Sequence, residues 1–519
     1  MRRGLIAPAG APSDAARALR DLRRARRRRA YGDIDWSDAL YKAYVTAIFS
    51  AIGGSIVSGY VGGDPVTAAE LATVSARGPA LVGVVVAVAL AAGLRSGGRG
   101  GPLALQPADV QLVLLAPLPR RVALRAPAAR QLRSAAFSGA IIGMVAGNLA
   151  AQRLPGSYGA WAAWGAVAGL VTGLTWTGSA LTASGARVGR RWAGALGALA
   201  LAWSAVDLSA GTATSPTSLL GRLAMSAVDA APTSAVGLLL LGLPAAGLVL
   251  VGGTSLEAAR RQAGLAAQLR FALTMQDLRT VLLLRRQLAA EGPRRRPWLR
   301  LPAGRRPRPV WRRDWQGILR WPATRILRIG LLGAVAGLAA AGAWRGTPAL
   351  VLASAAALLV AGLDSVEGQA QEADHLVRRD TLPVHPGRLL LRHLAAPSVV
   401  MTGVVAVAAG GAMALGGPAT VVQVAGVIGL PAALAATSGA ALSVQTGPID
   451  PFALEPFAGV RLFVRSVGPG VLAVAGVLPV LAARAAVDAG GSPVAGAVPA
   501  AAGVLVVVGA AAAWLRRTA

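Results

Sequence analysis

Long apolar runs recur along the whole chain and are separated by shorter polar stretches. A helix needs about 20 apolar residues to cross the hydrocarbon core of a bilayer, with a usable range of about 17–25. About twelve runs meet that length, and glycine is frequent inside them, as is typical of helices that pack closely in lipid. The pattern predicts an all-α polytopic integral membrane protein with spans near residues 41–62, 78–95, 133–151, 158–181, 190–210, 233–253, 326–343, 347–364, 396–416, 419–446, 466–484 and 494–515.

The distribution of basic residues predicts how these spans are oriented. The chain has 519 residues, is 55% hydrophobic and has a mean hydropathy of +0.57, yet it carries a formal charge of +30. With twelve spans, about 45 arginines fall in segments on the side of the two termini and five fall on the other side. Positive charge is retained in the cytoplasm. We therefore expect a multi-pass protein of the bacterial cytoplasmic membrane with both termini cytoplasmic.

A long basic interval divides the spans into two groups of six. It predicts four segments. Residues 1–40 are expected to form a basic amphipathic segment at the membrane surface, and residues 254–325 a basic cytoplasmic linker with amphipathic helices. Residues 41–253 and 326–519 are the two six-span halves.

The basic excess alone would also suit a nucleic-acid-binding protein. However, the arginines do not alternate with aromatic side chains that could stack on bases, and their positions follow the orientation of the spans. We therefore expect the basic segments to contact membrane lipids and no nucleic acid.

Each half repeats one order of signals between its second and third spans. In the first half, Asp109 precedes Leu118-Pro119, and an arginine-rich segment follows up to residue 133. In the second half, Asp374 precedes Leu382-Pro383, and Arg388 to Arg392 follow. We call residues 119–133 and 383–392 the first and second connectors. Proline at the start of a helix fixes the direction of the chain, so each connector is predicted to lead back into the membrane.

The repeated pattern resembles the permease subunits of type 2 ABC exporters. In these subunits, acidic residues after the second span precede a Leu-Pro and basic segment leading into the third. The whole chain is similar to the fused twelve-span form of such permeases, the actinobacterial type. The resemblance implies export driven by ABC ATPase subunits, two for each permease chain, that dock on short cytoplasmic helices. Residues 276–286 and 312–322 also resemble the cytoplasmic amphipathic helices that lead into a span in such permeases.

The resemblance nominates residues that would couple the permease to its ATPase. They are Asp109, Pro119, Arg120, Arg121, Glu367, Glu372, Pro383 and Arg388. The loop 447–465 is a rival docking site, with Glu455 as its candidate residue, because its aromatic and acidic side chains suit a protein partner. A basic loop that only keeps positive charge in the cytoplasm is the simpler interpretation of both connectors. Glu367 and Glu372 are expected to meet basic groups on a partner or on residues 312–328.

The sequence offers no catalytic machinery of its own. A P-loop needs a lysine in G-x-x-x-x-G-K-[ST], and the only lysine, Lys42, lies between Tyr41 and Ala43. We expect ATP hydrolysis only in a partner subunit and predict no cofactor, no metal and no catalytic residue. The alternative is a membrane-embedded enzyme or a scaffold acting with lipid-linked substrates. Such an enzyme would cluster carboxylates or histidines at one interface, whereas the acids of the predicted outer loops are scattered.

Buried polar groups within the predicted spans are scarce. Asn148 and Gln423 are the deepest, and each is expected to form a hydrogen bond between helices. The scarcity argues against ion-driven transport and favours an amphipathic or hydrophobic substrate. His375, His385 and His393 share one loop, but their spacing does not match a compact metal site, so they are interpreted as solvated.

Overall fold

The computed structural model describes residues 66–98, 107–116, 118–228, 242–274, 294–301, 309–374, 384–414, 420–444 and 458–518, with a few single positions elsewhere. These residues form helices and no strand. The chain divides into two compact units, one of residues 1–59 and 63–277 and the other of residues 60–62 and 278–519. The boundary between residues 277 and 278 lies inside the interval predicted as the linker.

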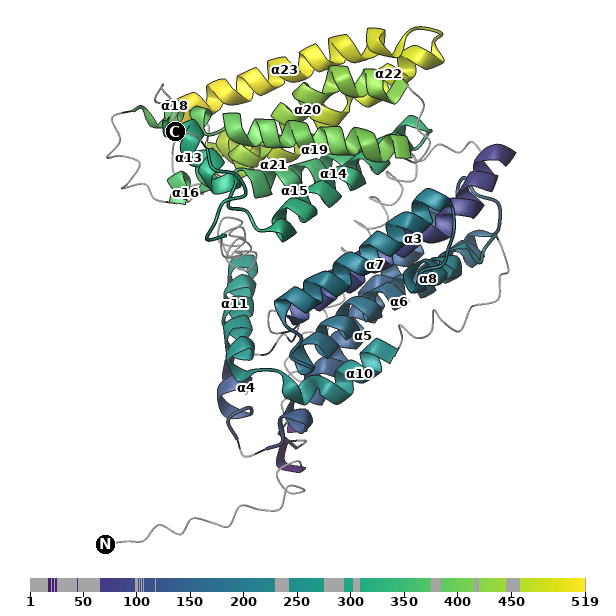
Figure 1. Ribbon diagram of the computed structural model, residues 1–519, viewed down its shortest axis with the longest axis vertical. Coiled ribbons are helices and arrows are strands. Elements are labelled where there is room, and N and C mark those ends of the chain that lie inside the picture. The colour runs from purple at the N-terminus through teal and green to yellow at the C-terminus, as the bar shows by residue number, and fades with distance from the viewer. Residues whose placement is uncertain are drawn as a thin grey trace. The chain divides into compact units, whose positions relative to one another are not determined.

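The first unit contains eight described α-helices and one 3₁₀ turn. They are α3 (Ala68–Gly97), α4 (Pro107–Leu112), α5 (Arg120–Ala151), α6 (Tyr158–Gly185), α7 (Arg190–Ala210), α8 (Pro216–Met225), α10 (Gly242–Leu250), η1 (Val251–Gly253) and α11 (Leu256–Thr274). The long helices α3, α5, α6 and α7 lie side by side (Figure 1). α11 turns away from α10 and η1 with a bend of 103°.

The second unit contains ten described helices. They are α13 (Pro309–Ile318), α14 (Ala323–Trp344), α15 (Leu350–Ser365), α16 (Glu367–Asp374), α18 (Pro386–Arg392), α19 (Ala395–Ala414), α20 (Thr420–Val444), α21 (Ala458–Val477), α22 (Pro479–Asp488) and α23 (Pro493–Thr518). Figure 1 shows the short helices α13, α16 and α18 gathered at one end of this unit and α22 at the other end.

Eight helices, or up to ten if two bent pairs each count as one span, are long and apolar enough to cross a membrane. The chain is therefore a multi-pass membrane protein. Each predicted span from 78–95 onward overlaps a described helix. The predicted span 41–62 lies outside the described residues, apart from position 44. The 28-residue α6 falls below the required hydropathy because Gly, Ser, Thr and Trp are frequent in it. The described helices thus support fewer spans than the twelve predicted.

A Gly-rich contact joins α5 and α6 almost backbone to backbone. Glycines or alanines recur every fourth residue on both helices: Ala135, Gly139, Gly143 and Gly147 on α5, and Gly165, Gly169 and Gly173 on α6. A Cβ added to Gly143 would lie 2.9 Å from the carbonyl carbon of Gly165 and 2.9 Å from the Cα of Gly169. Small residues at this spacing let transmembrane helices approach closely, and this arrangement aligns Cα–H groups with carbonyl oxygens of the partner helix.

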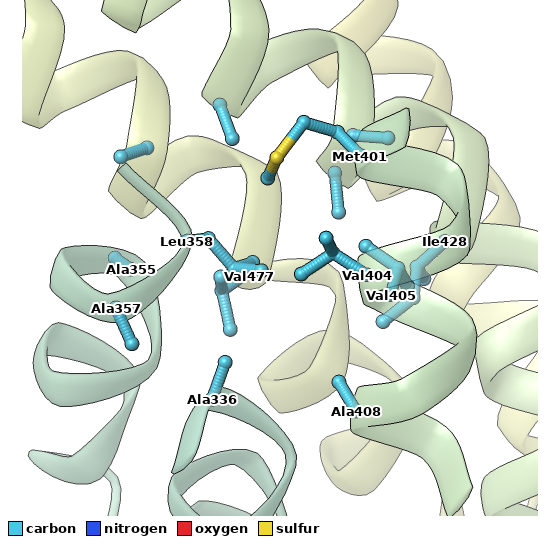
Figure 2. Close-up of a cluster of buried hydrophobic side chains, with 14 of the residues drawn as sticks. Ala336, Ala355, Ala357, Leu358, Met401, Val404, Val405, Ala408, Ile428 and Val477 are labelled. Atoms are coloured by element: carbon cyan, nitrogen blue, oxygen red, sulfur yellow. The ribbon is translucent and has the colours of Figure 1, made fainter. Parts of the chain in front are cut away.

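The core of the second unit is built from small apolar side chains of α14, α15, α19, α20, α21 and α22. Figure 2 shows Ala336, Val404, Ala408 and Val477 converging from several of these helices. α14 and α19 touch most closely at Gly337, where an added Cβ would lie 2.7 Å from the Cα of Ala408. Because the surrounding lipid is as apolar as these side chains, alanine and glycine hold the helices together by allowing close packing.

Among the described residues of each unit, the expected hydrogen bonds of Asn148 and Gln423 between helices are not found. Both side chains are exposed on their units, on α5 and α20 respectively, instead of lying buried between the packed helices of that unit. These two amide side chains therefore face outward from the unit that carries them.

Candidate functional site

The first connector is the N-terminal part of α5 and forms one continuous helix with the span that follows it. Pro119 is the residue before the first helical turn, and its carbonyl accepts hydrogen bonds from the amides of Val122 and Ala123 at 2.9 and 3.3 Å. The connector of this half therefore leads directly into the predicted third span, as the sequence suggested, and it does so as the first part of the spanning helix. Because Pro119 itself supplies the start of a regular helix, the chain enters the span without a break.

The connector is amphipathic in the first unit. Its apolar face packs into a core with α4, η1 and α11 through Leu124, Ala128 and Leu132, which are 0–6% exposed. Its arginines lie on the exposed face: Arg120, Arg121, Arg125, Arg130 and Arg133. The helix therefore presents positive charge away from the unit while its leucines fix its position.

The first connector also packs on the end of the last predicted span of its half. A Cβ added to Gly252 of η1 would lie 3.1 Å from the Cβ of Arg121. The side chain of Arg187, at the end of α6, donates from Nε to the carbonyl of Gly253 at 2.9 Å. Asp109 lies nearby in sequence, half-buried in the first turn of α4, and α4 packs against α11.

The second connector forms the separate short helix α18 in its described part. The helix begins at Pro386, and the side chain of His385 accepts the amide of Gly387 at 3.2 Å. Leu389 and Leu390 are buried, whereas Arg388 and Arg392 are exposed. Pro383, predicted as the helix-starting proline, lies outside the described residues. The sequence already contained the better signal, since Pro386 stands directly before the basic and leucine-rich run.

α18 packs on the end of α23, the helix predicted as the last span of its half, and the first connector packs on the end of the corresponding predicted span. A Cβ added to Gly387 would lie 2.8 Å from the Cα of Arg516, near the end of α23. In both units, therefore, a connector with buried leucines and exposed arginines contacts the C-terminal end of the helix predicted as the last span of that half. This shared arrangement was not predicted from the sequence.

A charged cluster lies at the end of the second unit that carries α13, α16 and α18. Glu372, 1% exposed, pairs with Arg313 of α13, and Glu367 pairs with Arg325 of α14. Arg325 also donates to the carbonyl of Asp364. One turn further along α14, Arg328 Nε lies 2.7 Å from Asp364 Oδ2. The predicted contact of Glu367 and Glu372 with residues 312–328 is confirmed.

Asp314 and His393 form a second, more deeply buried pair in the same cluster. His393 Nδ1 lies 2.9 Å from both carboxylate oxygens of Asp314, and the two side chains are 1% and 5% exposed. The interpretation of His393 as solvated is wrong. It ends α18, immediately before the apolar run of α19, and this placement carries the ring into the protein.

The packing around this pair leaves buried polar atoms with no hydrogen-bond partner among the described residues. These atoms are both ends of the Gln369 amide, Glu372 Oε2 and His393 Nε2. Glycine is required beside them, because a Cβ on Gly368 would lie 2.7 Å from Asp314 Oδ1. A partly satisfied buried polar cluster is a poor source of stability. It does specify how α13, α16, α18 and α19 are positioned relative to one another.

Trp298 and Trp321, which precede α14, make defined contacts with the protein. Trp321 is 7% exposed and belongs to the hydrophobic core, with the Arg325 guanidinium 4.3 Å from its ring centre. Trp298 donates from Nε1 to the carbonyl of Trp321 at 2.8 Å. Trp311 of α13 is 37% exposed and suits an interfacial position.

The remaining expectations divide between described and undescribed residues. Glu455 and most of the rival loop 447–465 lie outside the described residues. Among the residues that are described, no group of three or more His, Cys, Asp or Glu side chains could hold a metal ion. Comparison with protein-family models, with curated proteins and with solved structures finds no match to this chain.

Proposed function

We propose that this chain is the transmembrane permease subunit of a type 2 ABC exporter, powered by ATP hydrolysed in a separate ATPase subunit. The observation that carries the proposal is the equivalent placement of the two connectors. Each exposes arginines, buries leucines and contacts the end of the last predicted span of its own half. Two like elements in one chain suit a pair of identical partners, so one permease chain binds two ATPase subunits.

The exposed arginines of the connectors give each docking element its chemistry. Arg120 and Arg121 begin α5, and Arg388 and Arg392 lie on α18. Arginine is enriched at protein interfaces and pairs well with carboxylates. An acidic and apolar surface on the ATPase is the complementary partner.

The charged cluster supplies a route for movement in the second unit. A displacement of α18 acts on His393, which holds Asp314 of α13, and α13 is held to α16 by Arg313 and Glu372. Arg325 and Arg328 of α14 then bind Asp364 at the end of α15, and Arg325 also pairs with Glu367 of α16. Side-chain contacts of this kind link rigid helices into one moving group. The energy of ATP hydrolysis thus reaches the spans as a mechanical displacement.

The substrate class follows from the apolar character of the spans. Each candidate span has an 18-residue window with at most two charged residues. Charged groups within a membrane mark the paths of ions and polar substrates, so their scarcity favours an amphipathic or hydrophobic substrate.

The experiment isolates the tagged chain from native membranes and identifies and counts the proteins bound to it. Two copies of a P-loop ATPase per chain are expected. The triple variant Arg120→Glu/Arg121→Glu/Arg388→Glu should lower stimulation of the ATPase at least tenfold.

The matched control is Arg190→Glu/Arg191→Glu, an exposed arginine pair at the start of α7 on the same predicted side of the membrane. It should keep full stimulation, and both variants should reach wild-type abundance in the membrane. Equal loss in both variants would mean that the arginines only maintain topology. Loss only on changing 451–461 would assign docking to the rival loop. Recovery of the chain with a lipid-modifying enzyme and no ATPase would favour the alternative function as a scaffold for lipid-linked substrates.

A further inference from the structure

An apolar cavity of about 80 Å³ lies inside the second unit and is partly open to its surface. It is lined by α14, α15, α19, α20 and the junction of α21 and α22. Ala336, Ala408 and Val477 are among its lining residues, and Figure 2 shows these side chains pointing toward a common space. The hydroxyl of Ser354 also lines the cavity but is engaged, since it donates to the carbonyl of Ala336 at 2.9 Å.

The cavity lies at the end of the unit opposite the charged cluster. It follows α14 from Ala336 to Trp344, toward the C-terminal end of that helix. The cluster involves the first turns of the same helix, at Arg325 and Arg328. The eight helical steps of α14 from Arg328 to Ala336 span about 12 Å, which is close to the roughly 15 Å depth of one leaflet. The cavity therefore lies in the leaflet away from the charged cluster. In the predicted orientation, this is the outer leaflet.

The lining selects a hydrocarbon chain as the occupant. An apolar cavity does not hold water well, and protein interiors leave few voids of this size empty. An engineered cavity of about 150 Å³ accepts a benzene ring. This cavity is about half as large and suits the end of a linear chain better than a ring.

A guanidinium lies close to the cavity lining, one turn beyond the lining residue Val480. Arg484 of α22 donates from Nη1 to the carbonyl of Ala343 at 3.2 Å, next to the lining residue Trp344. Its Nε lies 3.4 Å from Asp488. Arginine binds phosphate through several donors at once and reaches the headgroup level from the end of a span.

We propose that the second unit binds one phospholipid, with the end of an acyl chain in this cavity and the phosphate against Arg484. The site lies within one unit and is independent of the proposed ATPase partner. The lipid fills space that small side chains leave between six helices, and it ties α14 to α22.

The test uses the purified full-length protein in detergent, titrated with phosphatidylglycerol brominated near the end of its acyl chain. Bromine quenches the fluorescence of a tryptophan that it touches. The quenching that belongs to Trp344 is the difference between the quenching measured for the wild type and that measured for Trp344→Phe. This signal is expected to saturate at one phospholipid per chain.

Two matched substitutions on α19 test whether the acyl chain of the lipid occupies the cavity. Ala409→Leu fills the cavity and should weaken binding at least tenfold, whereas Ala406→Leu, on the exposed face of the same helix, should leave it unchanged. If Ala409→Leu loses cooperative thermal unfolding, Ala425→Leu on α20 tests the same lining. Equal binding by the filled and control variants, or quenching that never saturates, overturns the proposal.

The phosphate contact has its own test. Arg484→Gln should weaken binding of the brominated phospholipid about tenfold and leave binding of a brominated alkane of equal chain length unchanged. If the two ligands respond alike, or the alkane already binds as tightly as the phospholipid in the wild type, Arg484 does not hold the headgroup.

Discussion

Replacing Gly143 by alanine tests the close contact between α5 and α6. The new Cβ would lie 2.9 Å from two backbone carbons of α6, whereas carbon atoms rest about 3.5–4.0 Å apart. The two helices would have to separate by roughly 1 Å, and contacts along the whole Gly-rich face would weaken. Forcing extra volume into a packed interface costs about 1–3 kcal/mol. Alanine regains about 0.5–1 kcal/mol because it favours a helix over glycine. The middles of these two ranges differ by about 1.25 kcal/mol, so the expected net loss is about 1–2 kcal/mol.

The assay is unfolding of the purified chain in mixed micelles with increasing sodium dodecyl sulfate. A loss of about 1–2 kcal/mol shifts the folding equilibrium about 5- to 30-fold. The control is Gly194→Ala on α7, where an added Cβ would meet nothing within 4 Å. It should be neutral or stabilise by up to about 1 kcal/mol. If Gly143→Ala were as stable as Gly194→Ala, the backbone contact between α5 and α6 would not exist in the protein.

Two further substitutions test buried polar contacts. Asp314→Ala leaves His393 buried without its partner and should cost about 2–3 kcal/mol in the same unfolding assay. Adding His393→Ala should cost less than the separate effects predict, and simple additivity would contradict the contact. At the end of α7, Asp207 is 1% exposed and accepts the amides of Thr214 and Ser215 at 3.1 and 2.8 Å. Asp207→Asn should raise hydrogen exchange of those two amides about tenfold by mass spectrometry, because bonds to a charged acceptor are stronger. Unchanged exchange would mean that the carboxylate does not hold this turn.

The helices could be located from the sequence because an apolar run in lipid has few alternatives to a helix. The residues at which the helices begin and end were harder to predict. α3 begins at Ala68, ten residues before the predicted start, because Thr67 and Glu70 cap each other's backbone amides in a capping box. Glu70 and Arg77 lower the hydropathy of that first stretch and hid it from a search for apolar runs.

The partners of particular residues could be predicted only where charge narrowed the choice. Glu367 and Glu372 lie among acids near one basic segment, so their pairing with arginines of α13 and α14 followed from opposite charge. The pair Asp314 and His393 joins positions 79 residues apart, and their types alone would equally suit a solvated loop. Glycine enrichment indicated close packing, but glycine carries no signal that distinguishes α6 from another partner of α5.

The close pairing of α5 and α6 has a consequence for the order in which the protein forms. The two helices are consecutive, and residues 152–157 alone connect them. Closing so short a connection costs little chain entropy, and local contacts form fastest. This hairpin can assemble as soon as α6 has left the ribosome. The corresponding contact of the second unit, between α14 and α19, joins helices separated by α15, α16 and α18. The first unit therefore acquires this packed nucleus early in synthesis, whereas the contact between α14 and α19 forms only after α19 has been made, with α14 and α15 able to pack first.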